Sequence, residues 1–138
     1  MIATTSHVRK WAQALAQAIG DQSRKRNMES VELYGIPRGG IPAAYAVAER
    51  LRAECPRLTP WVLSAAADLP TPRPPTADAC LVAVIDDIVV TGETMQRAIE
   101  KFKPDFVGML VNKPGGTLRF TGKYAWAYGH IAERDDWV

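Results

Sequence analysis

Two adjacent carboxylates and a short hydroxyl-rich turn are the residues of this chain best suited to chemistry. Asp86 and Asp87 follow a run of apolar residues, and Thr91-Gly92-Glu93-Thr94 comes soon after them. Paired acids accept hydrogen bonds from a vicinal diol, and a glycine turn with two threonines donates backbone and hydroxyl groups to an anion. The distance between the two acids and the turn is about that between a ribose and its own 5′-phosphate. The pattern therefore predicts a cradle for a phosphorylated sugar.

The segments around these residues predict a strand followed by a helix. Residues 81–85 are apolar and largely β-branched, which is typical of a parallel strand buried on both faces, and we expect this strand to end in the pair Asp86-Asp87. Beyond the turn, apolar residues recur at helical spacing: Met95, Ala98, Ile99 and Phe102. Ligands of open α/β sheets bind at the carboxyl ends of strands, and a helix N-terminus there favours anions.

A second turn of the same kind lies one strand earlier in the chain. Val31–Ile36 is predicted to be a strand, Pro37-Arg38-Gly39-Gly40 interrupts it, and a helix is expected from Ile41 to about Arg52. The two glycines allow positive φ and expose backbone N–H groups, and the guanidinium of Arg38 suits phosphate oxygens. The sequence therefore predicts two anion-binding turns at strand ends.

The remaining segments complete the α/β pattern. Residues 8–19 carry apolar side chains on one helical face, and we expect Gly20 to end that helix before a polar link, 21–30. The proline-rich stretch 66–78 is too long and polar for a core element and is predicted to be a loop. Further strands are predicted at 58–65 and 106–111.

Composition limits the class of protein. A chain of 138 residues, 47% of them hydrophobic, suits a single domain over residues 1–138. The formal net charge of +2 argues against a general nucleic-acid or membrane-surface binder. Cys55 and Cys80 lack metal-ligand spacing and are interpreted as reduced thiols in a cytoplasmic protein without a signal peptide or membrane span.

The two turns together resemble those of a known family. Ile85–Thr94 resembles the phosphoribosyl-pyrophosphate (PRPP) signature of type I phosphoribosyltransferases, and Gly35–Gly40 resembles their pyrophosphate-binding loop. The resemblance implies an α/β fold, a mostly parallel sheet flanked by helices with a small hood built from both termini. It also implies a homodimer or higher homo-oligomer that binds PRPP and a nucleobase with Mg²⁺.

The resemblance assigns a role to each motif residue. Asp86 and Asp87 are implied to be catalytic and to contact Mg²⁺, directly or through ribose hydroxyls or water. The 5′-phosphate is implied to bind at Val90, Thr91, Gly92, Glu93 and Thr94, and the pyrophosphate at Pro37, Arg38, Gly39 and Gly40. The loop at 66–78 occupies the position of a mobile loop that closes over the reacting centre.

A third motif resembles the 6-oxopurine branch of the family. Asn112-Lys113-Pro114-Gly115-Gly116 follows a predicted strand, and in that branch the lysine donates to the 6-oxygen of the purine. By the same resemblance, Trp137 stacks on the base and the backbone of Val138 meets its edge; in an alternative registration His130-Ile131 lies at the base. The implied reaction joins guanine, xanthine or hypoxanthine to PRPP and releases pyrophosphate.

Two residues depart from the pattern of that branch. Val90 stands where an aspartate usually contacts the purine N7 and transfers a proton, which valine cannot do. Glu93 occupies the variable position of the phosphate turn, and we expect its carboxylate to point away from the phosphate. Two other functions therefore stay open: a non-catalytic PRPP- or nucleotide-binding regulator on the same fold, and a transferase for another base such as orotate.

Overall fold

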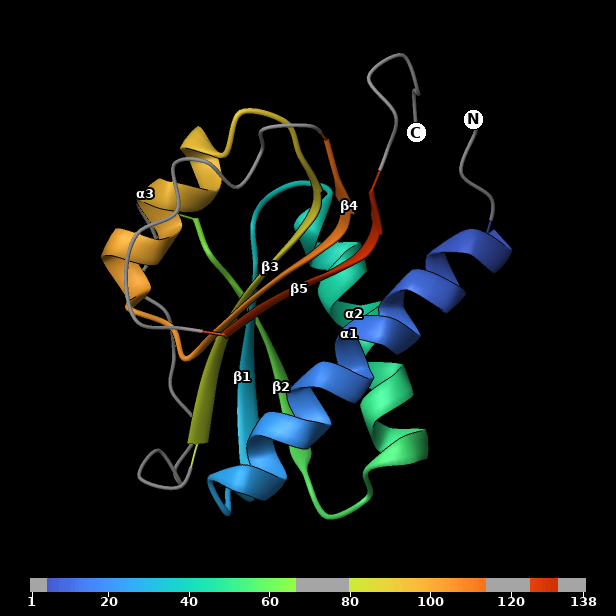
Figure 1. Ribbon diagram of the computed structural model, residues 1–138. Helices are drawn as coiled ribbons and strands as arrows, with labels where there is room; N and C mark the ends of the chain where they lie inside the picture. The colour runs from blue at the N-terminus through green and yellow to red at the C-terminus, as the bar shows by residue number, and fades with distance from the viewer. Residues whose placement is uncertain (1–4, 67–79, 114–124, 132–138) are drawn as a thin grey trace.

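The computed structural model describes residues 5–66, 80–113 and 125–131 (Figure 1). Four sequence predictions fall outside these residues: the proline-rich loop beyond Ala66, the turn that follows Lys113, the hood formed by the two ends of the chain, and the base contacts of Trp137 and Val138. No helix within the three described ranges is long and apolar enough to cross a lipid bilayer.

All five strands of the sheet run parallel, in the order β2-β1-β3-β4-β5. The strands are β1 (Ser30–Gly35), β2 (Thr59–Ser64), β3 (Cys80–Val89), β4 (Phe106–Asn112) and β5 (Ala125–Ile131). The chain moves outward from β1 to β2 in one direction and from β3 to β5 in the other. The direction of winding therefore reverses between β1 and β3, and such a switch point opens a crevice at the carboxyl ends of the two strands.

Helices cover both faces of the sheet (Figure 1). α1 (Thr5–Lys25) and α2 (Gly40–Glu54) share one face with a core cluster that includes Leu15, Leu33 and Leu51. α3 (Glu93–Phe102) lies on the opposite face with a second cluster. Of the four residues that the helical spacing predicts, Met95, Ala98 and Ile99 are buried and Phe102 is partly buried. The result is the three-layer arrangement expected of a parallel sheet whose strands are buried on both sides.

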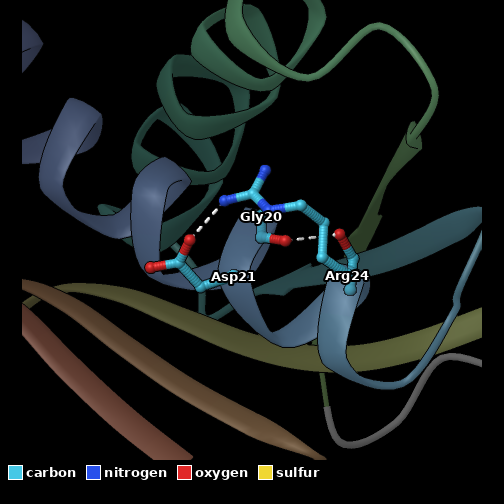
Figure 2. A network of polar contacts seen from close by, with 4 residues as sticks. Gly20, Asp21 and Arg24 are labelled. Carbon is cyan, nitrogen blue, oxygen red and sulfur yellow. Dashed lines mark hydrogen bonds and ion pairs between the residues drawn. The ribbon is translucent and has the colours of Figure 1, made fainter.

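The prediction that Gly20 ends the first helix is wrong. α1 continues to Lys25, because its inner face stays buried as far as Ser23, whose hydroxyl donates to the carbonyl of Gly20 (2.7 Å). Figure 2 shows this turn, with the Arg24 guanidinium paired to the Asp21 carboxylate one turn earlier. Arg24 and Lys25 also suit the negative end of the helix dipole. The chain leaves the helical conformation at Asn27, where φ is 53°.

The prediction that the central strand ends in the pair Asp86-Asp87 is also wrong. β3 runs on to Val89 because it keeps pairing with β4, with Asp86 opposite Met109 and Ile88 opposite Val111. Pairing with β1 stops earlier, at Ile85. The last four residues of β3 therefore extend past the end of β1, and the two acids belong to a strand and not to a loop.

The strand after α3 follows the prediction. Lys103 adopts the left-handed conformation (φ 47°) as the C-cap of α3, and Asp105 leads directly into β4. The side chain of Asp105 accepts a hydrogen bond from the backbone N–H of Val82 (2.9 Å) and pairs with Arg26 (2.8 Å). These contacts hold the connection between α3 and β4 against the first half of β3.

Candidate functional site

A cavity of about 290 Å³ lies at the switch point between β1 and β3. Three segments line it: the loop that follows β1, the extension of β3 with its two acids, and the turn that leads into α3. The structure thus brings together the two anion-binding turns that the sequence predicts, with the carboxylate pair between them. This cavity is the candidate functional site.

The loop after β1 is packed tightly against the acids. A Cβ atom at Gly39 would lie only 1.9 Å from the Oδ2 atom of Asp87, and one at Gly40 would lie 2.6 Å from the carbonyl oxygen of Ile85. Only glycine allows this approach. The peptide bond between Pro37 and Arg38 is cis. Pro37 and Arg38 are exposed and line the cavity.

The acids are half-buried and held by the backbone of their own strand. Asp86 accepts a hydrogen bond from the N–H of Asp87 (2.8 Å), and Asp87 accepts one from the N–H of Ile88 (2.8 Å). Within the described ranges no ion pair involves either acid. Burial, followed by the hydrogen bond and the negative charge of Asp87, raises the pKa of Asp86 to about 8.

The turn into α3 presents donors to the same cavity. Gly92 is the N-cap of α3 in the left-handed conformation (φ 79°, ψ 0°), and Thr91 and Thr94 are exposed beside it. The first N–H groups of a helix have no partner within it, so this end of α3 favours an anion. The carboxylate of Glu93 pairs with Arg97 one turn along the helix (2.7 Å), as expected for a side chain that points away from a phosphate.

Val90 lines the cavity, and Lys113 follows the end of β4 next to Val89. The side chain of Val90 is 57% exposed. Lys113 is half-buried at the end of β4, and its backbone N–H donates to the carbonyl of Val89 (2.9 Å). The ring of His130 on β5 instead stacks on Trp11 of α1, with 5.2 Å between the ring centroids.

The residues present fit a cation that is shared with a ligand. No group of three or more metal-ligating side chains occurs in the described part of the chain. Asp86 and Asp87 nevertheless offer carboxylate oxygens, without a basic partner there, next to an open cavity. Mg²⁺ often binds proteins through one or two carboxylates and completes its shell with phosphate oxygens and water.

The cavity wall also contains residues to which the sequence analysis gave no role in the site. Ile36, Ile88 and Met95 line it together with the predicted residues. Gly35 allows the loop to fold back, since a Cβ atom there would lie 2.6 Å from the carbonyl oxygen of Gly40. A glycine at the last position of a strand, five residues before another glycine, is the signal that could have indicated this contact.

Two solved structures of purine phosphoribosyltransferases have a similar fold. A variant of the hypoxanthine phosphoribosyltransferase from Trypanosoma cruzi, complexed with the product IMP, superposes with a TM-score of 0.69 at 15% identity, over 91% of this chain and 68% of that one. A hypoxanthine-guanine-xanthine phosphoribosyltransferase gives a TM-score of 0.67 at 16% identity, over 94% and 76% of the two chains. No protein-family model and no curated protein matches the sequence. The chain therefore has the type I phosphoribosyltransferase fold that its motifs predict.

Proposed function

We propose that this chain is a PRPP-dependent phosphoribosyltransferase that joins a purine base, of the 6-oxopurine type, to the ribose of PRPP and releases pyrophosphate. The observation that carries the proposal is the contact between the Pro37–Gly40 loop and the carboxylate of Asp87, across a cavity that the Thr91–Thr94 turn also lines. Two anion-binding turns that flank a pair of acids suit a sugar phosphorylated at both ends.

Each segment has a chemical task in this proposal. The N-terminus of α3 and the hydroxyls of Thr91 and Thr94 hold the 5′-phosphate, and Arg38 with the backbone of its loop holds the departing pyrophosphate. Asp86 and Asp87 accept hydrogen bonds from the ribose hydroxyls and stabilise the positive charge that develops at C1′. Mg²⁺, when bound through these acids and the substrate oxygens, neutralises charge on the pyrophosphate.

The base lies, in this proposal, on the side of the cavity nearest β4. Lys113 donates to the exocyclic 6-oxygen of the base, which favours oxo over amino purines because an amino group would oppose one donor with another. Trp137 and Val138 complete the base subsite as the family resemblance implies. Holding the base in line with C1′ and the leaving pyrophosphate accounts for much of the rate. The proposed protein acts in the cytoplasm as a homodimer or higher homo-oligomer.

The experiment that tests the proposal measures pyrophosphate release with PRPP, Mg²⁺ and each of six bases: guanine, xanthine, hypoxanthine, adenine, uracil and orotate. Turnover with an oxopurine supports the proposal, and turnover with orotate alone would assign a different base. The exposed apolar side chain of Val90 favours a second candidate, a non-catalytic regulator that binds PRPP or a nucleotide. Tight binding of PRPP without release of pyrophosphate from any base would support this regulator and reject the transferase.

A further inference from the structure

A second cavity, of about 340 Å³, adjoins the candidate site on the face of the sheet that α3 covers. It lies between α3, the loop after β1 and the end of β2, and Ile36, Pro37 and Thr94 line both cavities. The proposed function places no ligand in this side cavity. Its other described lining residues are Ala65, Ala66, Arg97, Ala98 and Lys101.

The charged residues that line the side cavity are cations. Arg97 and Lys101 lie one turn apart on α3, and the described residues of the lining include no carboxylate. The first cavity differs, because Asp86, Asp87 and Glu93 contribute three carboxylates to its described lining. The two neighbouring cavities therefore have different electrostatic character, and the side cavity favours an anion.

Existing contacts hold both cations at the side cavity and leave donors for a ligand. The guanidinium of Arg97 pairs with the carboxylate of Glu93 (2.7 Å) on an exposed face of α3. A guanidinium carries five N–H donors, and a carboxylate engages two of them at most, so others can reach phosphate oxygens. The ammonium group of Lys101 donates to the carbonyl of Ala66 (3.1 Å), which places its charge beside the same cavity.

The rest of the described lining is mainly apolar. Ile36 and Ala98 are 5% and 8% exposed and belong to the core cluster beneath α3, and Ala65 packs against that cluster. An organic group that covers these side chains gains hydrophobic stabilisation, which inorganic phosphate cannot gain. The volume of the cavity also lies within the range of small-molecule sites, about 300–1,000 Å³.

We propose that the side cavity is a second binding site, for a phosphate monoester whose phosphate lies between Arg97 and Lys101 and whose organic part packs on the apolar lining. A nucleoside monophosphate has both parts. Binding there does not depend on the proposed function. Because Pro37 and Thr94 line both cavities, the bound ester lies next to the two turns that receive PRPP in that function, which is the position of a regulatory ligand.

The test is an NMR titration of the 15.2 kDa chain, in which backbone amide shifts locate each bound anion. Ala66 and Ala98 report on the side cavity, whereas Gly39 and Ile88 report on the first cavity. Adenosine 5′-monophosphate, ribose 5-phosphate and inorganic phosphate are compared at constant ionic strength. We expect the nucleotide to shift the reporters of the side cavity and to bind there at least roughly tenfold more tightly than inorganic phosphate.

Variants identify the groups that bind. Arg97→Gln combined with Lys101→Gln should weaken nucleotide binding at the side cavity at least roughly tenfold, while the reporters of the first cavity still respond. Arg24→Gln is the matched control, because Arg24 also pairs with an acid on an exposed helix face, and it should leave the affinity unchanged.

Three results would overturn the proposal: shifts confined to the reporters of the first cavity, equal affinity for the nucleotide and inorganic phosphate, or unchanged nucleotide binding in the double variant. Failure of the proposed function is seen separately, as an absence of pyrophosphate release with every base.

Discussion

The substitution Asp86→Asn should remove a pH dependence of stability that arises in the cavity. The pKa of Asp86 is raised from 3.8 to about 8 in the folded chain, mainly by burial and also by Asp87. Between these two pKa values the folded state holds a proton on Asp86 that the unfolded state has lost. The free energy of unfolding therefore falls as pH rises through this window, by at most about 1.4 kcal/mol per pH unit.

The asparagine variant keeps an oxygen that accepts the hydrogen bond from the N–H of Asp87 but has no titrating group. Its stability relative to the wild type should therefore grow by about 2–3 kcal/mol between about pH 5.5 and about pH 7.5. Urea unfolding followed by tryptophan fluorescence, without PRPP or Mg²⁺, measures this difference at several pH values.

Asp21→Asn is the matched control. It also removes one carboxylate, but from a pair with Arg24 whose side chains are 62% and 64% exposed (Figure 2). Its offset from the wild type should stay within about 1 kcal/mol and change little with pH. If the curves of Asp86→Asn and the wild type also ran parallel over the whole range, Asp86 would be ionised in the free protein, and the assignment of its raised pKa would be refuted.

Four other changes test separate parts of the site. Gly39→Ala places a methyl group 1.9 Å from the Asp87 carboxylate and should reduce turnover roughly 100-fold, with nearly unchanged urea stability; normal turnover would show that this contact is dispensable. Gly92→Ala forces a residue with φ near 79° and should cost about 1–2 kcal/mol of unfolding free energy, which urea titration measures. Lys113→Ala should weaken purine binding in calorimetry and leave PRPP binding unchanged, whereas undiminished purine affinity would reject its role. Asp87→Asn should abolish pyrophosphate release, and full activity would contradict the role given to the acids.

The architecture could be predicted because its signals are local. The apolar spacing of Met95, Ala98 and Ile99 matches the buried face of α3, and the apolar run before Asp86 belongs to a strand buried on both faces. The pattern of strand, glycine turn and helix occurs twice, and this repetition is sufficient to predict a parallel sheet with ligands at its carboxyl end.

The failed predictions depend on contacts between distant segments. Gly20 lies within a helix because the packing of α1 on the sheet outweighs the weak helix propensity of one glycine. Asp86 lies within a strand because β4 continues to pair beyond the end of β1, and composition alone does not reveal this. No separate strand was predicted at Ala125–Ile131; there Gly129 packs against Trp11, where a Cβ atom would come within 2.3 Å of the Trp11 Cβ.

It could be predicted that the two turns lie at one site, but not how closely they approach the acids. Carboxyl ends of parallel strands meet at one edge of the sheet, so the Pro37–Gly40 loop and the Thr91–Thr94 turn were expected to share a site. The sequence gives no distances, however, and only the fold reveals that the loop touches the Asp87 carboxylate. The raised pKa of Asp86 likewise depends on burial, which arises only when the chain is folded.

The extension of β3 past β1 affects how much of the site must become ordered when a ligand binds. Asp86, Ile88 and Val89 pair with β4, and the N–H groups of Asp87 and Ile88 donate to the carboxylates of Asp86 and Asp87, so the segment is held in place without a ligand. A sugar that binds there meets acceptors whose positions are already set, and little entropy of ordering is lost on that side. The extension of β3 would thus keep its position when a ligand binds, while the two flanking turns adjust to the phosphates.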